Sequence, residues 1–565
     1  MSAASPPALG SKQSGVSSNP YIFATCFIAL IATAFGFMVR VNVMDTWQVQ
    51  FNLSETQKGE IFGVGLWPFA ISIVLFSLII DRIGYTIALW FACVCHILQV
   101  VLLLTAEGYW GLWIGTFIGA LGNGTVEAVI NPVIASIYHR NKTKWLTILH
   151  AGWPGGLVLA GFLAIFVGWI TQVPEMNPST GVEWAADDLA LVQAEAQDSW
   201  MWQIGLILIP VIVYGLMLIT CRFPVSERVA AGVSYRAMLQ EAGIFGCLIV
   251  TALIVAEIGR VFGIATWLQG DIILFVCVCY GMYVLTFGRG IFILLLLIMI
   301  PLATTELGTD SWIKALMAPI TNEWEINGLW ILVYTAFIMM VLRFCIGPLV
   351  RGLGPLGILA VSSIFAAVGI YGLANLSGET FAWIIIAATI YGIGQTFFWP
   401  CTLGVVAEQF PRGGALTLNA IAGVGMLGVG IIGAPLLGNL QDNQIHAQIA
   451  ASDPGEGLGG HMVLNEDLQT SVFGTYQKID QDRFAALESQ NPEAHAAIVE
   501  LQEEGKMSAL ELAAIPPIFM AICYVLLMLY YRSQGGYKPV DLGVDELPAE
   551  EDYLDGKNRF ISSED

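Results

Sequence analysis

Apolar residues fall in fourteen long runs separated by shorter polar stretches. A helix needs about 20 apolar residues to cross the hydrocarbon core of a bilayer, and each run approaches or exceeds that length. The pattern therefore predicts fourteen membrane-spanning helices. Their expected positions are residues 21–46, 57–80, 86–105, 110–138, 142–170, 200–220, 241–259, 271–287, 290–310, 327–347, 354–376, 381–409, 412–439 and 513–531.

The composition agrees with this pattern. Of the 565 residues, 56% are hydrophobic and only 12% are charged, and the mean hydropathy is +0.72. Such a chain has to be solvated by lipid, so we expect an all-α polytopic protein integral to the plasma (inner) membrane. The ten cysteines lie in or at the ends of the apolar runs. This placement predicts neither a disulfide framework nor a metal site.

The charges are concentrated outside the apolar runs. The net charge of −21 comes mainly from residues 171–200, 441–512 and the C-terminal tail, and no basic patch suited to nucleic acid is present. If the N-terminus is cytoplasmic, most Lys and Arg residues of the short loops lie on the cytoplasmic side, as the positive-inside rule requires. Both termini are then cytoplasmic.

An internal repeat divides the chain into two halves. A shift of 270 residues places glycine, leucine and threonine residues on identical residues across four helices. The matched pairs are Gly84 and Gly354, Leu89 and Leu359, Gly122 and Gly392, Gly124 and Gly394, Leu146 and Leu416, Thr147 and Thr417, and Gly155 and Gly425. The repeat predicts two parallel six-helix bundles, with two helices inserted between them.

The predicted boundaries follow from the runs and the repeat. We expect a cytoplasmic N-terminal tail (1–20), an N-terminal half (21–220), a cytoplasmic linker (221–240), two inserted helices (241–287), a C-terminal half (290–531) and an acidic cytoplasmic tail (532–565). The C-terminal half contains a long outer loop over 441–512. Its amphipathic, charge-rich pattern fits either outer helices or a solvated loop.

Few charged residues lie inside the predicted spans, and each costs roughly 2.5–3.5 kcal/mol to insert. Glu127 lies in the middle of the fourth span, one turn before Asn131. A carboxyl group there can bind a polar solute or exchange a proton, so we predict both roles for Glu127. The structural alternative is an acid capped by Asn131 or by Arg40 of the first span.

Glu306 lies in the outer half of its span, after Pro301. Proline can let a spanning helix bend and expose backbone groups to a cavity. With Trp312, Glu306 would give a hydrogen-bonding acid beside an aromatic platform, which suits a sugar ring. Alternatively, Asp310 and Trp312 mark the membrane interface, where tryptophan is common.

The helix that matches Glu127 in the second half carries Tyr391, Gln395 and Trp399, which we predict as aromatic and polar cavity residues. His150 and Asn419 lie at matching depths on the helices that follow. His150 can take part in proton transfer, or it can bond to a neighbouring hydroxyl group.

Motifs of enzymes and ATP-driven pumps are absent from the sequence. It has no Walker phosphate loop, no H-E-x-x-H and no G-x-S-x-G. We therefore expect no enzymatic activity and no cofactor. Uphill transport would draw on an ion gradient or on a separate subunit.

Two loops resemble a family motif. Asp81, Arg82 and Gly84 follow the second span, and Arg351 and Gly354 occupy the corresponding loop of the second half. Together with the two six-helix halves, these loops resemble the major facilitator superfamily, which carries a D-R-x-G type motif there. The resemblance implies that these five residues form gating loops.

Within that superfamily, the pattern G-x-G-x-x-E-x-x-x-N-P at residues 122–132 is similar to the fourth helix of the fucose/proton symporter group. The T-E-x-G segment at Glu306 is similar to sugar porters of the same type. The resemblance implies that Glu127 takes part in sugar binding and proton coupling. In that group an acid of the first helix accompanies this glutamate, whereas Arg40 occupies the comparable stretch here.

We therefore predict a monomeric secondary transporter that moves a sugar or related polyhydroxy solute by alternating access, with H⁺ as the possible coupling ion. One alternative is an anion transporter that uses Arg40, with Arg343 expected to snorkel at the cytoplasmic end of its helix. A second alternative is a non-transporting sensor or assembly protein that binds a partner through the loop at 441–512.

Overall fold

The structure is a computed structural model of the whole chain. It describes residues 16–53, 55–171, 199–310, 329–375, 381–433, 469–471, 474–476, 481–544 and 547–550. Within these ranges nearly all regular structure is helical. A small antiparallel pair, β1 (Gln469–Ser471) and β2 (Gly474–Tyr476), is the exception among the described residues.

Six spans make up the N-terminal half, and three of them consist of two helices in succession. They are α1 (Asn19–Gln50), α2 (Glu55–Val64) with α3 (Trp67–Ile83), α4 (Tyr85–Leu104), α5 (Tyr109–Ile137), α6 (Lys142–Leu149) with α7 (Gly152–Ile170), and α9 (Ser199–Gly205) with α10 (Leu208–Leu218).

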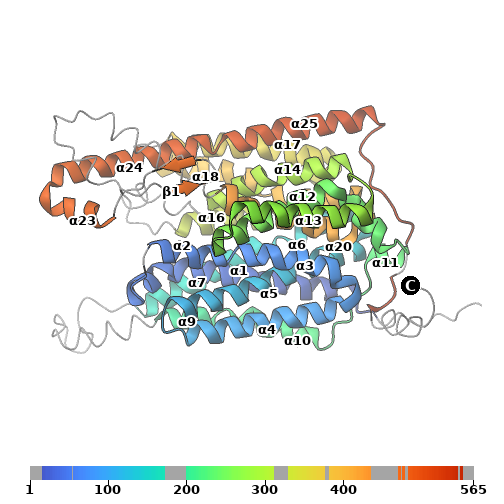
Figure 1. Ribbon diagram of the computed structural model, residues 1–565, viewed down its shortest axis with the longest axis horizontal. Helices are drawn as coiled ribbons and strands as arrows, with labels where there is room; N and C mark the ends of the chain where they lie inside the picture. Colours follow the sequence, from blue (N-terminus) through green and yellow to red (C-terminus); the bar gives the residue numbers. More distant parts are fainter. Residues whose placement is uncertain are drawn as a thin grey trace, which may run out of the picture.

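The C-terminal half repeats this plan. It contains α14 (Gly290–Ala303) with the π-helical turn η2 (Thr304–Gly308), α16 (Leu329–Phe344), α17 (Ile346–Ala374), α18 (Phe381–Gln395) with α19 (Phe398–Gln409), α20 (Gly414–Gly428) with the π-helical turn η4 (Val429–Gly433), and α25 (Ile515–Ser533). Figure 1 shows the two halves as two layers of roughly parallel helices.

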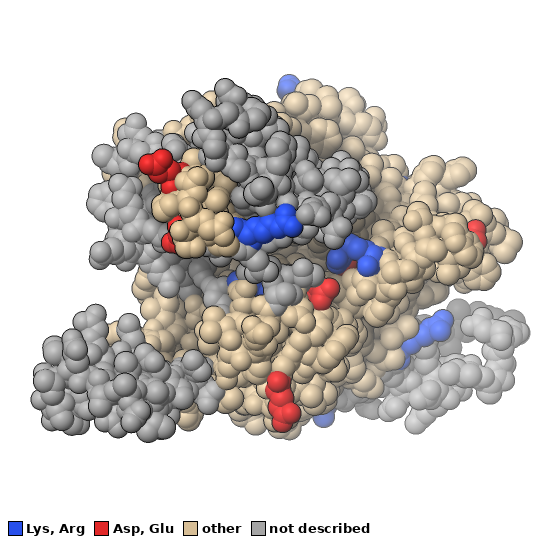
Figure 2. Space-filling view, turned by 60° about the vertical axis from the view of Figure 1, so that its left-hand side comes forward, with Lys and Arg blue, Asp and Glu red and all other residues tan. Residues whose placement is uncertain are grey.

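Thirteen described helical segments are long and apolar enough to cross a membrane, and the shorter apolar helix at Trp330–Phe344 brings the number to fourteen. The prediction of about fourteen spans is thus confirmed. Figure 2 shows a described surface on which uncharged residues predominate and charged side chains are sparse. Many large apolar side chains are exposed on the described helices, and a surface of this kind is stable in contact with lipid.

The inserted helices are α12 (Tyr235–Phe262) and α13 (Thr266–Val284). Figure 1 shows this hairpin in front of the bundle, between the two layers. The Tyr280 hydroxyl donates to the Leu239 carbonyl at 2.7 Å and ties α13 to α12. Of the residues of α13, only Val284 is buried. The outer face of the hairpin is therefore exposed and suited to contact with lipid.

The 270-residue repeat recurs in the backbone. Gly84 has a φ of 88° immediately before α4, and Gly354 has a φ of 67° at a kink inside α17, where the longer part of that helix begins. These left-handed conformations are available to glycine with little strain. The two loops thus enter their helices in the same way.

Several basic residues gather at one end of the bundle, which we call the basic end: Arg82, Lys142, Arg228 and Arg412. The short helices α11 (Glu227–Ala230), η1 (His139–Asn141) and η3 (Pro411–Gly413) lie there. Lys142 Nζ lies 2.5 Å from Glu227 and 3.3 Å from the Ala407 carbonyl oxygen. These bonds join the two halves at the basic end.

The outer loop predicted over 441–512 is described only in part. Its described residues form β1, β2, α23 (Gln481–Gln490) and α24 (Pro492–Leu512), at the far end of the molecule from α11 (Figure 1). For this part of the loop, the helical alternative is confirmed.

Candidate functional site

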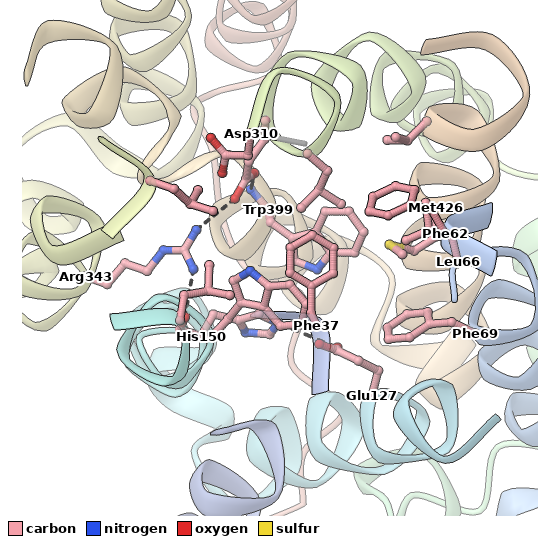
Figure 3. Close-up of a pocket in the computed structure, with 16 residues that line it drawn as sticks. Phe37, Phe62, Leu66, Phe69, Glu127, His150, Asp310, Arg343, Trp399 and Met426 are labelled. Carbon is pink, nitrogen blue, oxygen red and sulfur yellow. Dashed lines mark hydrogen bonds and ion pairs between the residues drawn. The ribbon is translucent and has the colours of Figure 1, made fainter. Parts of the chain in front are cut away.

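A cavity of about 280 Å³ lies between the two halves. Figure 3 shows aromatic rings and charged groups converging on it. The first half contributes Phe37, Phe62, Leu66, Phe69, Glu127, His150, Trp153 and Leu157, and the second half contributes Glu306, Leu307, Asp310, Leu332, Arg343, Trp399, Met426 and Val429. Eleven of these sixteen side chains are apolar. An apolar chamber with a few polar groups is typical of a small-molecule site.

The helices around the cavity are interrupted where they reach it. Breaks separate α2 from α3, α6 from α7, and α18 from α19, while α14 and α20 pass into the π-helical turns η2 and η4. Such breaks free backbone groups, and within a membrane they are tolerated where they line a cavity or are buried in protein. Each break or turn borders a residue that lines the cavity.

Glu127 reaches the cavity from the middle of α5. Asn131, one turn later, donates its amide to the Glu127 carboxylate at 2.7 Å and to the Glu127 carbonyl oxygen at 3.1 Å. Asn131 is fully buried and does not line the cavity. It therefore positions the carboxylate rather than contacting the contents of the cavity.

His150 lies in the break between α6 and α7. Its Nδ1 is 3.0 Å from the Leu146 carbonyl oxygen, which can only accept a hydrogen bond, so Nδ1 carries a proton. The other ring nitrogen, Nε2, faces Glu127 with 3.7 Å between Nε2 and Oε2. A neutral His150 thus presents a proton acceptor to the same space as the Glu127 carboxyl group.

Glu306 lies in η2 and forms a buried ion pair with Arg343 of α16. Arg343 Nη2 donates to Glu306 Oε1 at 3.0 Å, and both side chains are less than 5% exposed. Arg343 Nε donates to the Thr396 carbonyl oxygen and Nη1 to the His150 carbonyl oxygen, each at 2.7 Å. The guanidinium group therefore links the second half to the α6–α7 break of the first half.

The α18–α19 break completes the surroundings of these acids. The Trp399 amide, at the start of α19, donates to Glu306 Oε2 at 3.2 Å. Gln395 donates to Asp310 at 3.2 Å, and the Tyr391 hydroxyl donates to the Thr305 carbonyl oxygen at 2.9 Å. Trp399 lines the cavity, whereas Tyr391 and Gln395 lie behind it and support the acid-bearing turn.

Three other predicted residues lie outside the cavity lining or outside the described residues. Arg40 is buried beside the cavity, with its guanidinium carbon 5.9 Å from the centre of the Phe37 ring and 6.0 Å from that of Phe62. Asn419 donates to the Ala128 carbonyl oxygen at 3.0 Å and so ties α20 to α5. Trp312 lies outside the described residues.

Comparison with known proteins identifies the family. The family model of the Major Facilitator Superfamily matches residues 23–435. The chain belongs to the Major Facilitator Superfamily. No curated protein sequence matches it closely enough to count as a relative.

Solved structures of this superfamily share the fold. The proton:xylose symporter XylE, bound to 6-bromo-6-deoxy-D-glucose, aligns with a TM-score of 0.53 and 14% identity over 88% of this chain and 94% of XylE. The human organic anion transporter MFSD10 aligns with a TM-score of 0.50 and 9% identity over 89% of this chain and 100% of MFSD10. The E. coli fucose:proton symporter FucP, in the outward conformation, aligns with a TM-score of 0.49 and 13% identity over 88% of this chain and 98% of FucP. For XylE and MFSD10, at these identities, the likeness is one of fold.

The predicted gating loops of this superfamily member lie at the basic end. Asp81 accepts a hydrogen bond from the Ser226 hydroxyl at 3.1 Å and pairs with Arg228. The guanidinium carbon of Arg82 lies 5.2 Å from the centre of the Tyr235 ring. In the second half, Arg351 is exposed. The first loop is therefore fixed by the linker and by α12, and its gating role stays a prediction.

Sequence reasoning missed two charged residues of the site. The expectation that Arg343 snorkels to the end of its helix is wrong, because the side chain is 1% exposed and bonded to Glu306. Asp310 lines the cavity, whereas the sequence offered it only as a marker of the membrane interface. The aromatic wall of the cavity, with Phe37 and Trp153 at 5.7 Å between ring centres, had no distinguishing signal among the many aromatics of the spans.

Proposed function

We propose that this protein is a secondary-active transporter that moves a small hydroxylated solute, such as a sugar or a polyol, by alternating access and coupled to protons. The observation that carries the proposal is the pairing in one cavity of carboxylates from both halves with aromatic walls. A volume of about 280 Å³ is close to the lower end of the usual range for ligand sites, which begins at about 300 Å³.

The chemistry of the lining suits a hydroxylated ring. The carboxylates of Glu127 and Asp310 accept hydrogen bonds from hydroxyl groups, and bonds to charged groups are stronger than neutral ones. The faces of Trp153 and Trp399 offer apolar surface for the C–H faces of a ring. Such an arrangement binds the two kinds of surface that a sugar presents.

Proton coupling is proposed from the geometry around Glu127. The Glu127 carboxyl group and His150 Nε2 face one another across 3.7 Å, and both line the cavity. A proton on either group changes the charge that the solute meets. Binding of solute and proton would thereby depend on each other.

The anion alternative receives less support from this site. The Arg343 guanidinium already binds Glu306 and two backbone carbonyl groups, and Arg40 is not among the lining residues. The second candidate is instead a small organic cation, because three carboxylates face the cavity beside a single arginine. The apolar lining of the cavity would hold the uncharged part of such a solute.

The basic end is proposed to face the cytoplasm, with both chain termini on that side. Most of the Lys and Arg residues in short loops lie in the loops at this end, as the positive-inside rule requires for the cytoplasmic side. The described outer helices α23 and α24 would then lie on the opposite side of the membrane.

Uptake into proteoliposomes tests the proposal. The substrates are neutral sugars, polyols, a small organic cation and a small organic anion, each with and without an inward proton gradient. We expect Glu127→Gln to lower uptake of the accepted solute at least about tenfold, since a hydrogen bond to a charged group is worth about 1.5–3 kcal/mol. We also expect Glu127→Gln to remove the dependence of uptake on the gradient.

Glu488→Gln is the matched control, because Glu488 is an exposed acid of α23. It should transport like the unchanged protein. Uptake that depends on the proton gradient as strongly in Glu127→Gln as in the control would contradict the role of Glu127. Uptake of the anion alone would contradict the proposed solute class.

A further inference from the structure

The chain after α25 turns back across the basic end. The Tyr537 hydroxyl donates to Glu408 Oε2 at 2.8 Å, and the Val540 amide donates to the Glu408 carbonyl oxygen at 2.8 Å. Gln409 donates its side-chain amide to the Lys538 carbonyl oxygen at 2.9 Å. These bonds attach the start of the tail to the end of α19, in the second half. Figure 1 shows the tail running from α25 along this end of the molecule to the layer of the first half.

The far end of the same tail is attached to the first half. The Val225 amide donates to the Pro548 carbonyl oxygen, and the Glu550 amide donates to the Phe223 carbonyl oxygen, each at 3.0 Å. Pro224 and Ala549 form an antiparallel bridge between these bonds. Residues 547–550 thus pair with the segment that follows α10. We call residues 537–544 and 547–550 the strap.

The Glu550 side chain caps α4. Its carboxylate accepts hydrogen bonds from the amides of Tyr85, at 2.6 Å, and Thr86, at 3.2 Å, in the first turn of the helix. Free amides and the helix dipole make this end of a helix favourable for a negative charge. Glu550 is only 6% exposed, and a β-carbon at Gly84 would lie 2.5 Å from Glu550 Oε1. The Glu550 carboxylate therefore fits against the loop of the D-R-x-G type at a position where only glycine leaves room for it.

At the other end of the strap, Tyr537 binds the Glu408 carboxylate, which joins the two halves. The carboxylate of Glu408 binds Tyr537 through Oε2, and its Oε1 accepts hydrogen bonds from the Thr143 amide at 3.1 Å and the Thr143 hydroxyl at 2.5 Å. Thr143 belongs to α6 of the first half. Burial beside Glu408 raises the pKa of the Tyr537 phenol well above its ordinary value, so the hydroxyl keeps its proton and remains a donor.

We propose that the strap is an autoinhibitory lock. It stabilises the state in which the two halves are joined at the basic end, and its release favours the state that is open at that end. Alternating access requires the halves to separate there. The strap is attached to α19 in one half and to α4 in the other, and it orients the carboxylate that binds Thr143. It therefore binds the joined state better than the separated state and shifts the equilibrium between them. This inference does not depend on the solute.

Hydrogen–deuterium exchange of the full-length protein tests the lock without a substrate. In Glu550→Gln we expect the amides of α6, residues 142–149, to exchange at least about fivefold faster, because weaker charge-assisted bonds raise the population of the open state. The control is Asp541→Asn. Asp541 is an exposed acid of the same tail whose carboxylate accepts a bond from the Gly543 amide within its own turn. Exchange in α6 should be unchanged in the control.

The readout on α6 separates a lock from a tail that is merely docked. Loss of the Glu550 cap speeds exchange at the start of α4 in either case. If exchange rises there while α6 exchanges as in Asp541→Asn, the lock is refuted.

A pair of truncations gives an independent measurement. Ending the chain after Gly536 removes the strap, whereas ending it after Glu550 keeps every strap contact described above. Faster exchange of α6 in the shorter chain alone supports the lock. Equal exchange of α6 in the two truncated chains overturns it.

Discussion

The buried ion pair of Glu306 and Arg343 gives the sharpest test of the site. Glu306→Gln removes the charged partner of a guanidinium that is 1% exposed and that cannot become neutral by losing a proton. Breaking a buried pair from one side costs about 3–5 kcal/mol, because an uncompensated charge stays behind. We expect Glu306→Gln to lower the free energy of unfolding by that amount.

Arg343→Gln should cost less than Glu306→Gln. The carboxyl group left behind can take up a proton and become neutral, and it keeps the hydrogen bond from the Trp399 amide at 3.2 Å. In the double variant neither charge remains. The loss of unfolding free energy in the double variant should therefore be smaller than the sum of the losses in the two single variants, by about 2 kcal/mol or more.

Unfolding of the purified protein in a titration with sodium dodecyl sulfate measures these free energies. The matched control is the pair of Glu241 and Arg289, whose atoms are 3.3 Å apart but whose arginine side chain is 59% exposed. Exposed pairs contribute about 0–1 kcal/mol. If the coupling energy of the central pair is no larger than that of this exposed pair, the buried pair does not hold the site together as argued.

Two further variants test the backbone and the positioning of the acid. Gly84→Ala should lower the free energy of unfolding by about 1–3 kcal/mol, because φ is 88° and a β-carbon would meet the tail carboxylate. Gly352→Ala, at a helical position of α17 where a β-carbon has open space, should not lower the stability in thermal unfolding, because alanine is favoured over glycine in a helix. Asn131→Ala should raise the KM for uptake at least about tenfold, because it removes a hydrogen bond to the Glu127 carboxylate worth about 1.5–3 kcal/mol. Asn375→Ala removes an exposed bond of the same intrahelical kind, and an equal change in KM there would show that Asn131 has no special role.

The fold could be predicted because lipid imposes a simple requirement on the sequence. Each span needs a long apolar run, so the runs located the helices to within a few residues in most cases. One of the exceptions, the start of α12, has a physical reason. This helix begins at Tyr235, after Ser234, whose hydroxyl accepts a bond from the Ala237 amide. Its polar first turns lie outside the apolar run, and hydropathy does not detect them.

The site could be predicted in part because buried charge is rare in a membrane. That argument found Glu127, His150 and Glu306, which all line the cavity. It failed for Arg343, because depth was judged from the end of an apolar run. α16 ends at Phe344 and α17 begins at Ile346, so the chain stays almost continuously helical beyond Arg343. The partners of Arg343 come from distant helix breaks, which only the folded chain brings together.

The contact of Arg343 with the carbonyl oxygen of His150 has a consequence for variation among related chains. The guanidinium group recognises the main chain at this position, since the bond ends on a backbone oxygen. The side chain at position 150 is therefore free to change without loss of the bridge between the halves. The proposed coupling chemistry and the mechanical linkage can therefore evolve separately at a single residue, the first through the imidazole and the second through the peptide group.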